Sequence, residues 1–329
     1  MKVLLIYPPL EKMIKTQHPD ALEKVSVGHL PPLGLLYVAG YLEARSSHQV
    51  EVLDAIMDHM SYQQVEERIR KSKPQVVGIY STIFTWIDVL YVTRLVKKID
   101  RNIHVCLGGP LVSVYPEDIM ERDSIDSAVI EEGEVSFTEL VTHLEENKPL
   151  ERVRGIIYRE NGCIKRTEPR EGIPDLDTLP FPARHLISYK DYYDLIGRRK
   201  PMTTISTSRG CPNKCSFCNR IGLEGYRTRS PGNIVKEIEH CVNLGIGEFF
   251  IIDDNFTLDR QRVMGFCNLL IKKKLPIDWD IRTRVDAIDE EMVDKLKAAG
   301  CKMVRFGVES GTEEILKVLN KKLTVKKIE

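Results

Sequence analysis

The sequence of 329 residues predicts an α/β protein made of a doubly wound parallel sheet followed by a partial (β/α) barrel. Over about the first 150 residues, short β-rich apolar runs alternate with helical patterns. Prolines at 174, 180 and 182 then interrupt regular structure, and a second alternation begins near residue 203. Strands that alternate with helices favour parallel sheets covered by helices.

The first alternation predicts a parallel sheet and the edge of that sheet at which a ligand would bind. Ligands of such sheets bind outside the carboxyl ends of the strands. The predicted strands are 2–7, 50–53, 75–80, 103–107 and 128–130, and the predicted helices are 33–43, 62–71, 86–99 and about 135–146.

A hairpin and a linker are expected next. Residues 155–158 and 163–166 flank Asn161-Gly162, a pair typical of a two-residue hairpin turn. We therefore divide the chain into an α/β domain (1–150), a hairpin with a proline-rich linker (151–199) and the partial barrel (200–329).

The second alternation supplies four βα units, the periodicity of a (β/α) barrel. Strands are expected near 203–207, 248–252, 278–282 and 302–307, and helices near 231–244, 259–273, 289–299 and 312–319.

Composition sets broad limits on function. Lys plus Arg and Asp plus Glu are both 48, so there is no overall field to attract nucleic acid. No segment is long and apolar enough to span a bilayer, and the opening MKVLLIYPP is cut short by prolines. We therefore expect a cytoplasmic protein, in which eight cysteines act as thiols or ligands rather than disulfides.

Three cysteines form the most specific motif. Cys211, Cys215 and Cys218 have the spacing CxxxCxxC after the first barrel strand. Chance placement of eight cysteines in 329 residues predicts about 0.005 such triplets. Thiolates suit iron–sulfur clusters or zinc, but structural zinc wants a fourth local ligand. Three cysteines without a nearby fourth indicate a cluster with one open iron.

This motif, with Phe217 before the last cysteine, resembles the signature of the radical S-adenosylmethionine (SAM) superfamily. The resemblance implies a [4Fe-4S] cluster whose open iron chelates SAM. Reductive cleavage would then give a 5′-deoxyadenosyl radical that abstracts hydrogen from a small-molecule substrate, with a reductant such as flavodoxin or ferredoxin. The catalytic acid or base, if any, is not indicated.

The same resemblance assigns SAM-binding roles at the ends of the later strands. These residues are Phe217, Asp253, Asp254, Arg282, Glu309 and Ser310, with Arg284 as a further candidate for an anion. The simpler alternatives are helix N-capping by Asp253 and Asp254, and surface ion pairs for the two arginines.

An α/β domain ahead of such a barrel resembles the cobalamin-binding radical SAM family, which includes anaerobic magnesium-protoporphyrin monomethyl ester cyclases and class B radical SAM methyltransferases. The resemblance implies a flavodoxin-like, cobalamin-binding first domain. It places the cofactor at Asp54, Ser81, Thr82, Gly108, Gly109, Glu132 and Gly133, with Tyr80 or Trp86 near the corrin face. The alternative is that Gly108-Gly109 is a tight turn and Trp86 a core aromatic.

One motif of cobalamin-dependent mutases, DxHxxG, is absent. Asp54 is followed by Ala55-Ile56, so no histidine stands at the position that would ligate cobalt.

We expect radical methylation of an unactivated carbon, with oxidative cyclisation or rearrangement of a porphyrin-like or other substrate as the alternative. An alternative outside the enzymes is a corrinoid-binding or sensing module with an inactive barrel. A methylthiotransferase acting on RNA would want further cluster cysteines in the first half. Four βα units, against the usual six of this superfamily, predict a missing C-terminal part or a partner chain.

Overall fold

A computed structural model describes residues 1–12, 29–194, 196–219 and 225–329. Within this part of the chain the residues form two compact units. The second unit holds residues 29–31, 174–178 and those described from 189 onward, and the first unit holds the others. Each unit is described by itself.

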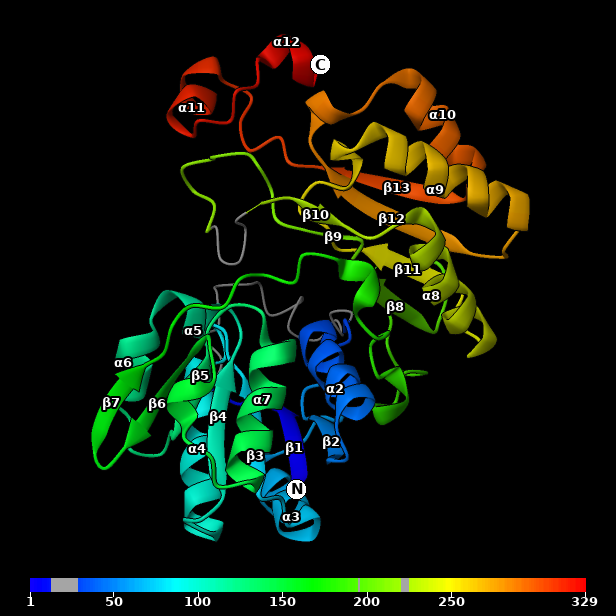
Figure 1. The fold of residues 1–329 in the computed structure, drawn as a ribbon. Coiled ribbons are helices and arrows are strands. Elements are labelled where there is room, and N and C mark those ends of the chain that lie inside the picture. The colour runs from blue at the N-terminus through cyan, green and yellow to red at the C-terminus, as the bar shows by residue number, and fades with distance from the viewer. Residues whose placement is uncertain (13–28, 195, 220–224) are drawn as a thin grey trace. The chain divides into compact units, whose positions relative to one another are not determined.

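The first unit is a seven-stranded sheet with helices on both faces (Figure 1). The strand order is β2-β1-β3-β4-β5-β6-β7, and β1 to β5 run parallel. The strands are β1 (Lys2–Tyr7), β2 (Gln49–Asp54), β3 (Val76–Tyr80), β4 (His104–Gly108), β5 (Ser127–Val129), β6 (Ile156–Glu160) and β7 (Cys163–Arg166). The helices are α2 (Leu33–Arg45), α3 (Tyr62–Ser72), α4 (Trp86–Ile99), α5 (Pro110–Val114), α6 (Pro116–Met120) and α7 (Gly133–Glu145).

Alternation along β1 explains why both faces of the sheet are covered. Leu4 and Ile6 pack in a buried cluster with residues of α3 and α4. Val3 and Leu5 point the other way, into a cluster with residues of α2 and α7. Side chains on a strand alternate between faces, so a strand with four consecutive buried apolar residues needs helices on both sides. The predicted doubly wound sheet is confirmed.

The predicted hairpin is present and adds to this sheet. Asn161 and Gly162 have φ values of 51° and 79°, as a type I′ turn requires. β6 pairs antiparallel with β5, so the sheet is mixed rather than wholly parallel. The proline-rich segment that follows contains the short 3₁₀ turns η2 (Leu176–Thr178) and η3 (Arg184–Leu186).

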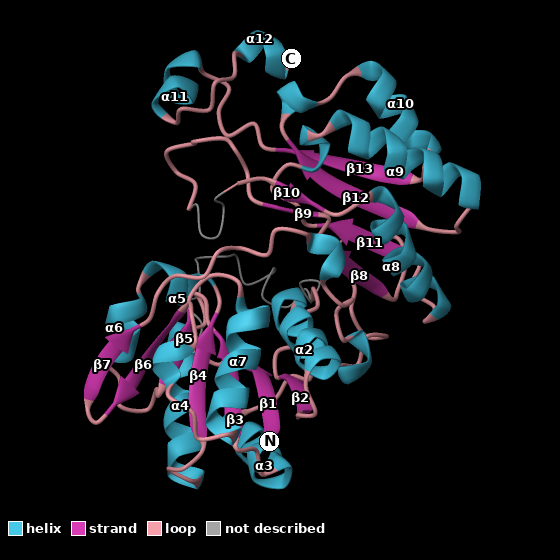
Figure 2. Cartoon of the chain, viewed as in Figure 1, coloured by secondary structure: helices cyan, strands magenta, loops and turns pink. Residues whose placement is uncertain are grey.

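The second unit contains a four-stranded parallel sheet in the order β13-β12-β11-β8, drawn in magenta in Figure 2. Its strands are β8 (Met202–Ile205), β11 (Glu248–Ile251), β12 (Asp278–Thr283) and β13 (Cys301–Phe306), with a small pair formed by β9 (Ser208–Arg209) and β10 (Arg227–Thr228). The helices are α8 (Pro231–Asn243), α9 (Arg260–Lys273), α10 (Glu290–Ala298), α11 (Glu313–Val318) and α12 (Val325–Ile328). The predicted partial barrel is confirmed.

The two faces of this second sheet differ in chemistry. Ile251, Trp279 and Ile281 pack in a buried cluster with side chains of α8, α9 and α10. The alternate positions point to the opposite face and include charged residues, among them Asp280 and Arg282. An apolar face under helices and a polar face toward the barrel interior fit a sheet that binds a ligand on its inner side.

Among the described residues, no helix combines the length and the apolar character needed to cross a membrane.

Candidate functional site

The cysteine loop, residues 210–218, follows β8 and β9 in the second unit. Cys211 and Cys215 are half-buried and Cys218 is exposed, and none of the three is in a disulfide. Asn213 donates through its side-chain amide to Cys211 Sγ at 3.3 Å. Within the described residues, no three His, Cys, Asp or Glu side chains lie close enough together to hold a metal ion. The chemistry of the donor set, three accessible soft thiols, fits a cluster.

The other five cysteines differ in their surroundings. Cys106, Cys241, Cys267 and Cys301 are buried in the cores, whereas Cys163 is exposed in the hairpin. Burial raises the pKa of Cys106, Cys267 and Cys301 to about 12 in each case, which keeps these thiols protonated. These three buried thiols are structural residues of the cores.

A positive side chain stands beside the cysteine loop. The pKa of Arg284 is raised, first by its hydrogen bonds to Asp286 and also by the nearby thiols of Cys215 and Cys211. Arg284 is buried and also donates to the carbonyl of Lys321 at 2.8 Å. The alternative of a solvated surface ion pair is therefore wrong for Arg284, whose buried guanidinium is held by Asp286 and by the carbonyl of Lys321.

Asp253 anchors the chain that leads into the cysteine loop. Its Oδ1 accepts from the backbone N–H of Thr207 at 2.6 Å and of Ser208 at 3.1 Å. Its Oδ2 accepts from the hydroxyls of Thr207 at 2.5 Å and Ser208 at 2.6 Å. The guanidinium of Arg262 lies 3.6 Å from the same oxygen, and Asp253 is 2% exposed. Both carboxylate oxygens are therefore engaged within the protein.

N-capping does not account for Asp253 or Asp254. The helix that follows, α9, is capped by Asp259, whose side chain accepts from the backbone N–H of Arg262 at 3.0 Å. Asp254 is exposed at the end of β11.

Arg282 lies on the inner face of the sheet. Its guanidinium stands 4.9 Å from the centroid of the Phe250 ring, and that of Arg305 stands 4.2 Å from the same ring. The pKa of Arg282 is lowered, mainly because the side chain is partly buried and secondly because the positive charge of Arg305 is near. The negative charge of Asp254 acts in the opposite direction. A guanidinium in such surroundings is ready to accept an anion.

Glu309 and Ser310 follow β13. Glu309 has a φ of 66° and pairs with Lys321 at 2.8 Å. Ser310 Oγ lies 3.2 Å from the hydroxyl of Thr312. The Phe217 ring is 51% exposed, and the ammonium of Lys321 stands 5.5 Å from its centroid. Glu309 and Phe217 thus both contact one lysine, which the sequence analysis did not single out.

The candidate corrinoid residues lie at the carboxyl edge of the first sheet. Asp54 ends β2 and is buried, and its Oδ1 accepts from the backbone N–H of Ile56 and of Met57, each at 3.1 Å. It therefore shapes the turn after β2. His59 lies beyond this turn, with a φ of 49°.

Ser81, Gly108 and Gly109 form one junction between β3 and β4. The backbone N–H and the hydroxyl of Ser81 both donate to the carbonyl of Gly108, at 2.8 and 3.0 Å. A Cβ at Gly109 would lie 2.7 Å from the Ser81 carbonyl, whereas a Cβ at Gly108 would have no neighbour within 4 Å. The chain is therefore closely packed at Gly109 and open at Gly108.

Thr82 and Glu132 complete the junctions at this edge. The Thr82 hydroxyl lies 3.0 Å from that of Thr85, just before α4. Glu132 accepts from the backbone N–H of Ile173 at 2.8 Å. Gly133 is the first residue of α7, so Glu132 and Gly133 lie at the start of a helix.

An apolar surface at this edge was missed by the sequence analysis. Ile83, Phe84 and Ile87 are 54%, 58% and 49% exposed, where the chain leaves β3 and enters α4. Trp86 is partly buried against the core. Exposed apolar side chains beside an open backbone at Gly108 fit a flat macrocycle such as a corrin ring. Apolar residues in a loop directly after a buried strand were the available signal.

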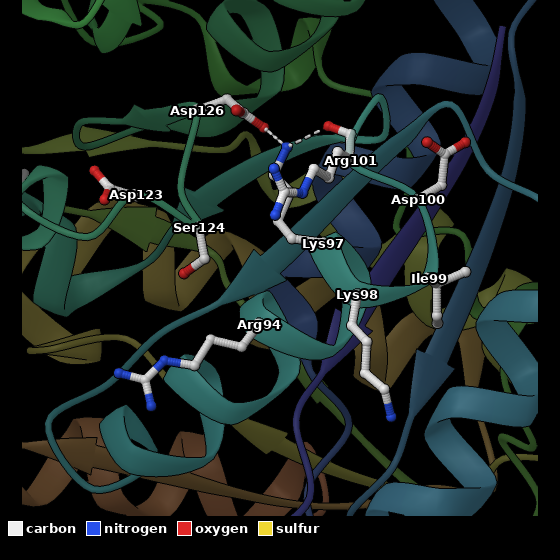
Figure 3. Close-up of a pocket in the computed structure, with 9 residues that line it drawn as sticks. All are labelled: Arg94, Lys97, Lys98, Ile99, Asp100, Arg101, Asp123, Ser124 and Asp126. Carbon is white, nitrogen blue, oxygen red and sulfur yellow. Dashed lines mark hydrogen bonds and ion pairs between the residues drawn. The ribbon is translucent and has the colours of Figure 1, made fainter.

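A pocket of about 1010 Å³ lies elsewhere in the first unit. Its lining residues are Arg94, Lys97, Lys98, Ile99, Asp100, Arg101, Asp123, Ser124 and Asp126 (Figure 3). These segments precede β4 and β5, so the pocket is at the amino ends of the strands. Lys97 is bound there by Asp126 at 2.6 Å and by the carbonyl of Arg101 at 3.3 Å (Figure 3).

Replacement of Gly109 by alanine is expected to destabilise the first unit by about 2 kcal/mol. The φ of 103° is unfavourable for an L side chain, and the new Cβ would meet the Ser81 carbonyl. Chemical denaturation of the Gly109→Ala and Gly108→Ala variants measures the difference. Equal losses from the two variants would show that the junction is not closely packed.

Family models match both units. The description of the first is a B12 binding domain, over residues 21–141, and that of the second is the radical SAM superfamily, over residues 205–329.

Two curated relatives illustrate the similarity. An uncharacterized methyltransferase of Pyrococcus horikoshii is 34% identical over 98% of this chain and 69% of the relative. An anaerobic magnesium-protoporphyrin IX monomethyl ester cyclase of Rubrivivax gelatinosus is 31% identical over 99% of this chain. The chain spans 58% of the length of that cyclase.

Solved structures share the fold. The cobalamin-dependent SAM radical enzyme OxsB, with aqua-cobalamin and SAM bound, superposes with a TM-score of 0.80 at 22% identity, over 99% of this chain and 46% of that one. The radical SAM methyltransferase TsrM of Kitasatospora setae superposes with a TM-score of 0.76 at 20% identity, over 99% of this chain and 64% of that one. With the two domain matches and the Pyrococcus relative, the chain belongs to the radical SAM enzymes that carry a B12-binding domain.

Proposed function

We propose that the chain is a cobalamin-dependent radical SAM methyltransferase acting on an unactivated carbon of a small molecule. The observation that carries this proposal is the cysteine loop, whose three cysteines are not in disulfides and whose Cys211 and Cys215 lie near the buried Arg284. When bound, the [4Fe-4S] cluster supplies the electron that cleaves SAM, and cobalamin carries the methyl group. A cytoplasmic location and a reductant such as flavodoxin or ferredoxin belong to the same proposal.

The protein's own residues have distinct parts in this proposal. Cys211, Cys215 and Cys218 hold the cluster, and Asp253 fixes the chain that precedes them. Asp254, Arg282, Glu309, Ser310 and Phe217 contact SAM, where Arg282 supplies a cation for its carboxylate. Because both oxygens of Asp253 are engaged, we assign it to support of the loop rather than to a direct contact.

The corrinoid part of the proposal rests on the carboxyl edge of the first sheet. Gly108 lets a ligand approach the backbone, and the exposed Ile83 and Phe84 offer apolar surface to it. Asp54, Ser81, Thr82, Gly109, Glu132 and Gly133 shape the surrounding loops through the hydrogen bonds and close contacts described above. No histidine at this edge is proposed as a cobalt ligand.

Oxidative cyclisation is the second candidate, favoured by the 31% identity to the Rubrivivax cyclase. A corrinoid sensor with an inactive barrel is a third reading, against which the intact cysteine triplet argues.

Gly108→Ala tests the corrinoid site directly. The added methyl group has room in the protein but would occupy the space that the ligand needs, so cobalamin affinity should fall at least tenfold without loss of stability. Spectral titration with cobalamin measures the change. Gly232→Ala is the control, because a Cβ at Gly232 on α8 also has no neighbour within 4 Å. Equal affinity in all three proteins would contradict the placement of the ligand at Gly108.

Anaerobic reconstitution with iron, sulfide and cobalamin, followed by iron, sulfide and cobalt analysis, tests the cofactors together. The proposal expects about four irons and one corrinoid per chain. An intact cluster without cobalt would leave a radical SAM enzyme that does not use cobalamin.

A further inference from the structure

A turn distant in sequence lies against the cysteine loop. We call residues 318–321, at the end of α11, the α11 turn. The backbone N–H of Ser216 donates to the carbonyl of Leu319 at 3.0 Å. The Ser216 hydroxyl donates to the carbonyl of Val318 at 3.2 Å. The side-chain amide of Asn320 donates to the carbonyl of Lys214 at 2.6 Å. The α11 turn therefore holds the middle of the cysteine loop.

Lys321 ends this turn and is buried, with 5% of its surface exposed. Its Nζ donates to Glu309 Oε1 at 2.8 Å and stands 5.5 Å from the centroid of the Phe217 ring. A buried ammonium is costly unless it is paired. The carboxylate of Glu309 supplies the pairing charge, and the face of the aromatic ring adds a cation–π contact.

The backbone around Glu309 is built to admit this ion pair. A Cβ at Gly307 would lie 2.9 Å from Glu309 Oε1 and 3.1 Å from Lys321 Nζ, so a side chain there would displace the ion pair from its present position. Glu309 itself has a φ of 66°, a left-handed conformation that non-glycine residues rarely adopt. A strained residue beside a glycine that makes room for its side chain indicates that the direction of the Glu309 carboxylate matters.

We propose that Lys321 is a positioning residue of the SAM site, which aims Glu309 at the ribose hydroxyls of SAM and packs against Phe217. Lys321 holds Oε1 of Glu309 at 2.8 Å, and in this proposal the other carboxylate oxygen accepts from the ligand. Through the α11 turn, Lys321 also ties this part of the site to the cysteine loop. This inference rests on the proposed function, since SAM is the ligand.

Equilibrium binding of SAM to the anaerobically reconstituted full chain tests the inference. Lys321→Met should bind SAM at least tenfold more weakly than the unsubstituted protein and keep the same iron content. Glu309→Gln should show a similar loss. The double variant Glu309→Gln with Lys321→Met should be no weaker than Glu309→Gln alone, because Lys321 acts through Glu309.

Two controls accompany these variants. Lys326→Met removes an exposed lysine nearby on α12 and should leave SAM affinity unchanged. If Lys321→Met lowers the thermal midpoint, the comparison is repeated with Lys321→Gln, which keeps a hydrogen-bond donor toward Glu309.

Three results would overturn the inference. These are unchanged SAM affinity in both Lys321 variants, additive losses in the double variant, or loss of iron from both Lys321 variants, which would assign Lys321 to the cysteine loop alone. Failure of the proposed function would look different, because the unsubstituted protein would then hold its cluster and bind no SAM.

Discussion

Replacement of Cys215 by alanine is expected to abolish assembly of the iron–sulfur cluster. A cubane cluster in this loop depends on three thiolates, and with two the remaining irons would be open to solvent. After anaerobic reconstitution, iron should fall from about four per chain to below about 0.4. Iron and sulfide analysis, with the absorption of the cluster in the visible range, measures the loss.

Cys163→Ala is the matched control for this prediction. Cys163 is likewise a cysteine outside any disulfide, but it lies exposed in the hairpin of the first unit. Its replacement should leave the iron content unchanged. Retention of a full cluster in Cys215→Ala would contradict the assignment of the cysteine loop.

The second large effect is expected at Asp253. Its replacement by alanine removes the acceptor of two backbone N–H groups and two hydroxyls and leaves the buried Arg262 without its nearby carboxylate. Loss of one member of a buried charged network costs about 3–5 kcal/mol. The free energy of unfolding of the second unit should fall by that amount, as measured by chemical denaturation.

Asp254 provides the control, because it is the same residue type next along the chain and is exposed. Asp254→Ala should change the free energy of unfolding by less than about 0.5 kcal/mol. Asp253→Ala should also lower the iron content, since residues 207 and 208 lead directly into the cysteine loop. Equal stability of the two variants would show that the Asp253 network does not hold this segment.

The strands and long helices could be predicted from the sequence because their burial is periodic. In β1 the four consecutive residues 3–6 are apolar and buried, and β11 and β12 place apolar side chains toward the helices at alternate positions. The predicted strands near 248–252 and 278–282 differ from β11 and β12 by one residue each. Here, local pattern and tertiary packing favour the same structure.

Short elements and long-range contacts could not be predicted in this way. α5 and α6 have five residues each, too few to show a helical period. The bonds between the α11 turn and the cysteine loop join residues about 100 positions apart, and nothing in the local sequence marks them. The partners of Asp253 were hidden for the same reason. A carboxylate at the end of a strand suggests a ligand contact, but tertiary structure decided which donors reach it.

In the proposed function, the cysteine loop binds a cluster that cleaves SAM. The most direct test is to incubate the anaerobically reconstituted chain with SAM and a strong reductant and to measure 5′-deoxyadenosine. The unsubstituted protein should form 5′-deoxyadenosine, and Cys215→Ala should form none. No 5′-deoxyadenosine and no other SAM cleavage product from a protein that carries a complete cluster would contradict the claim.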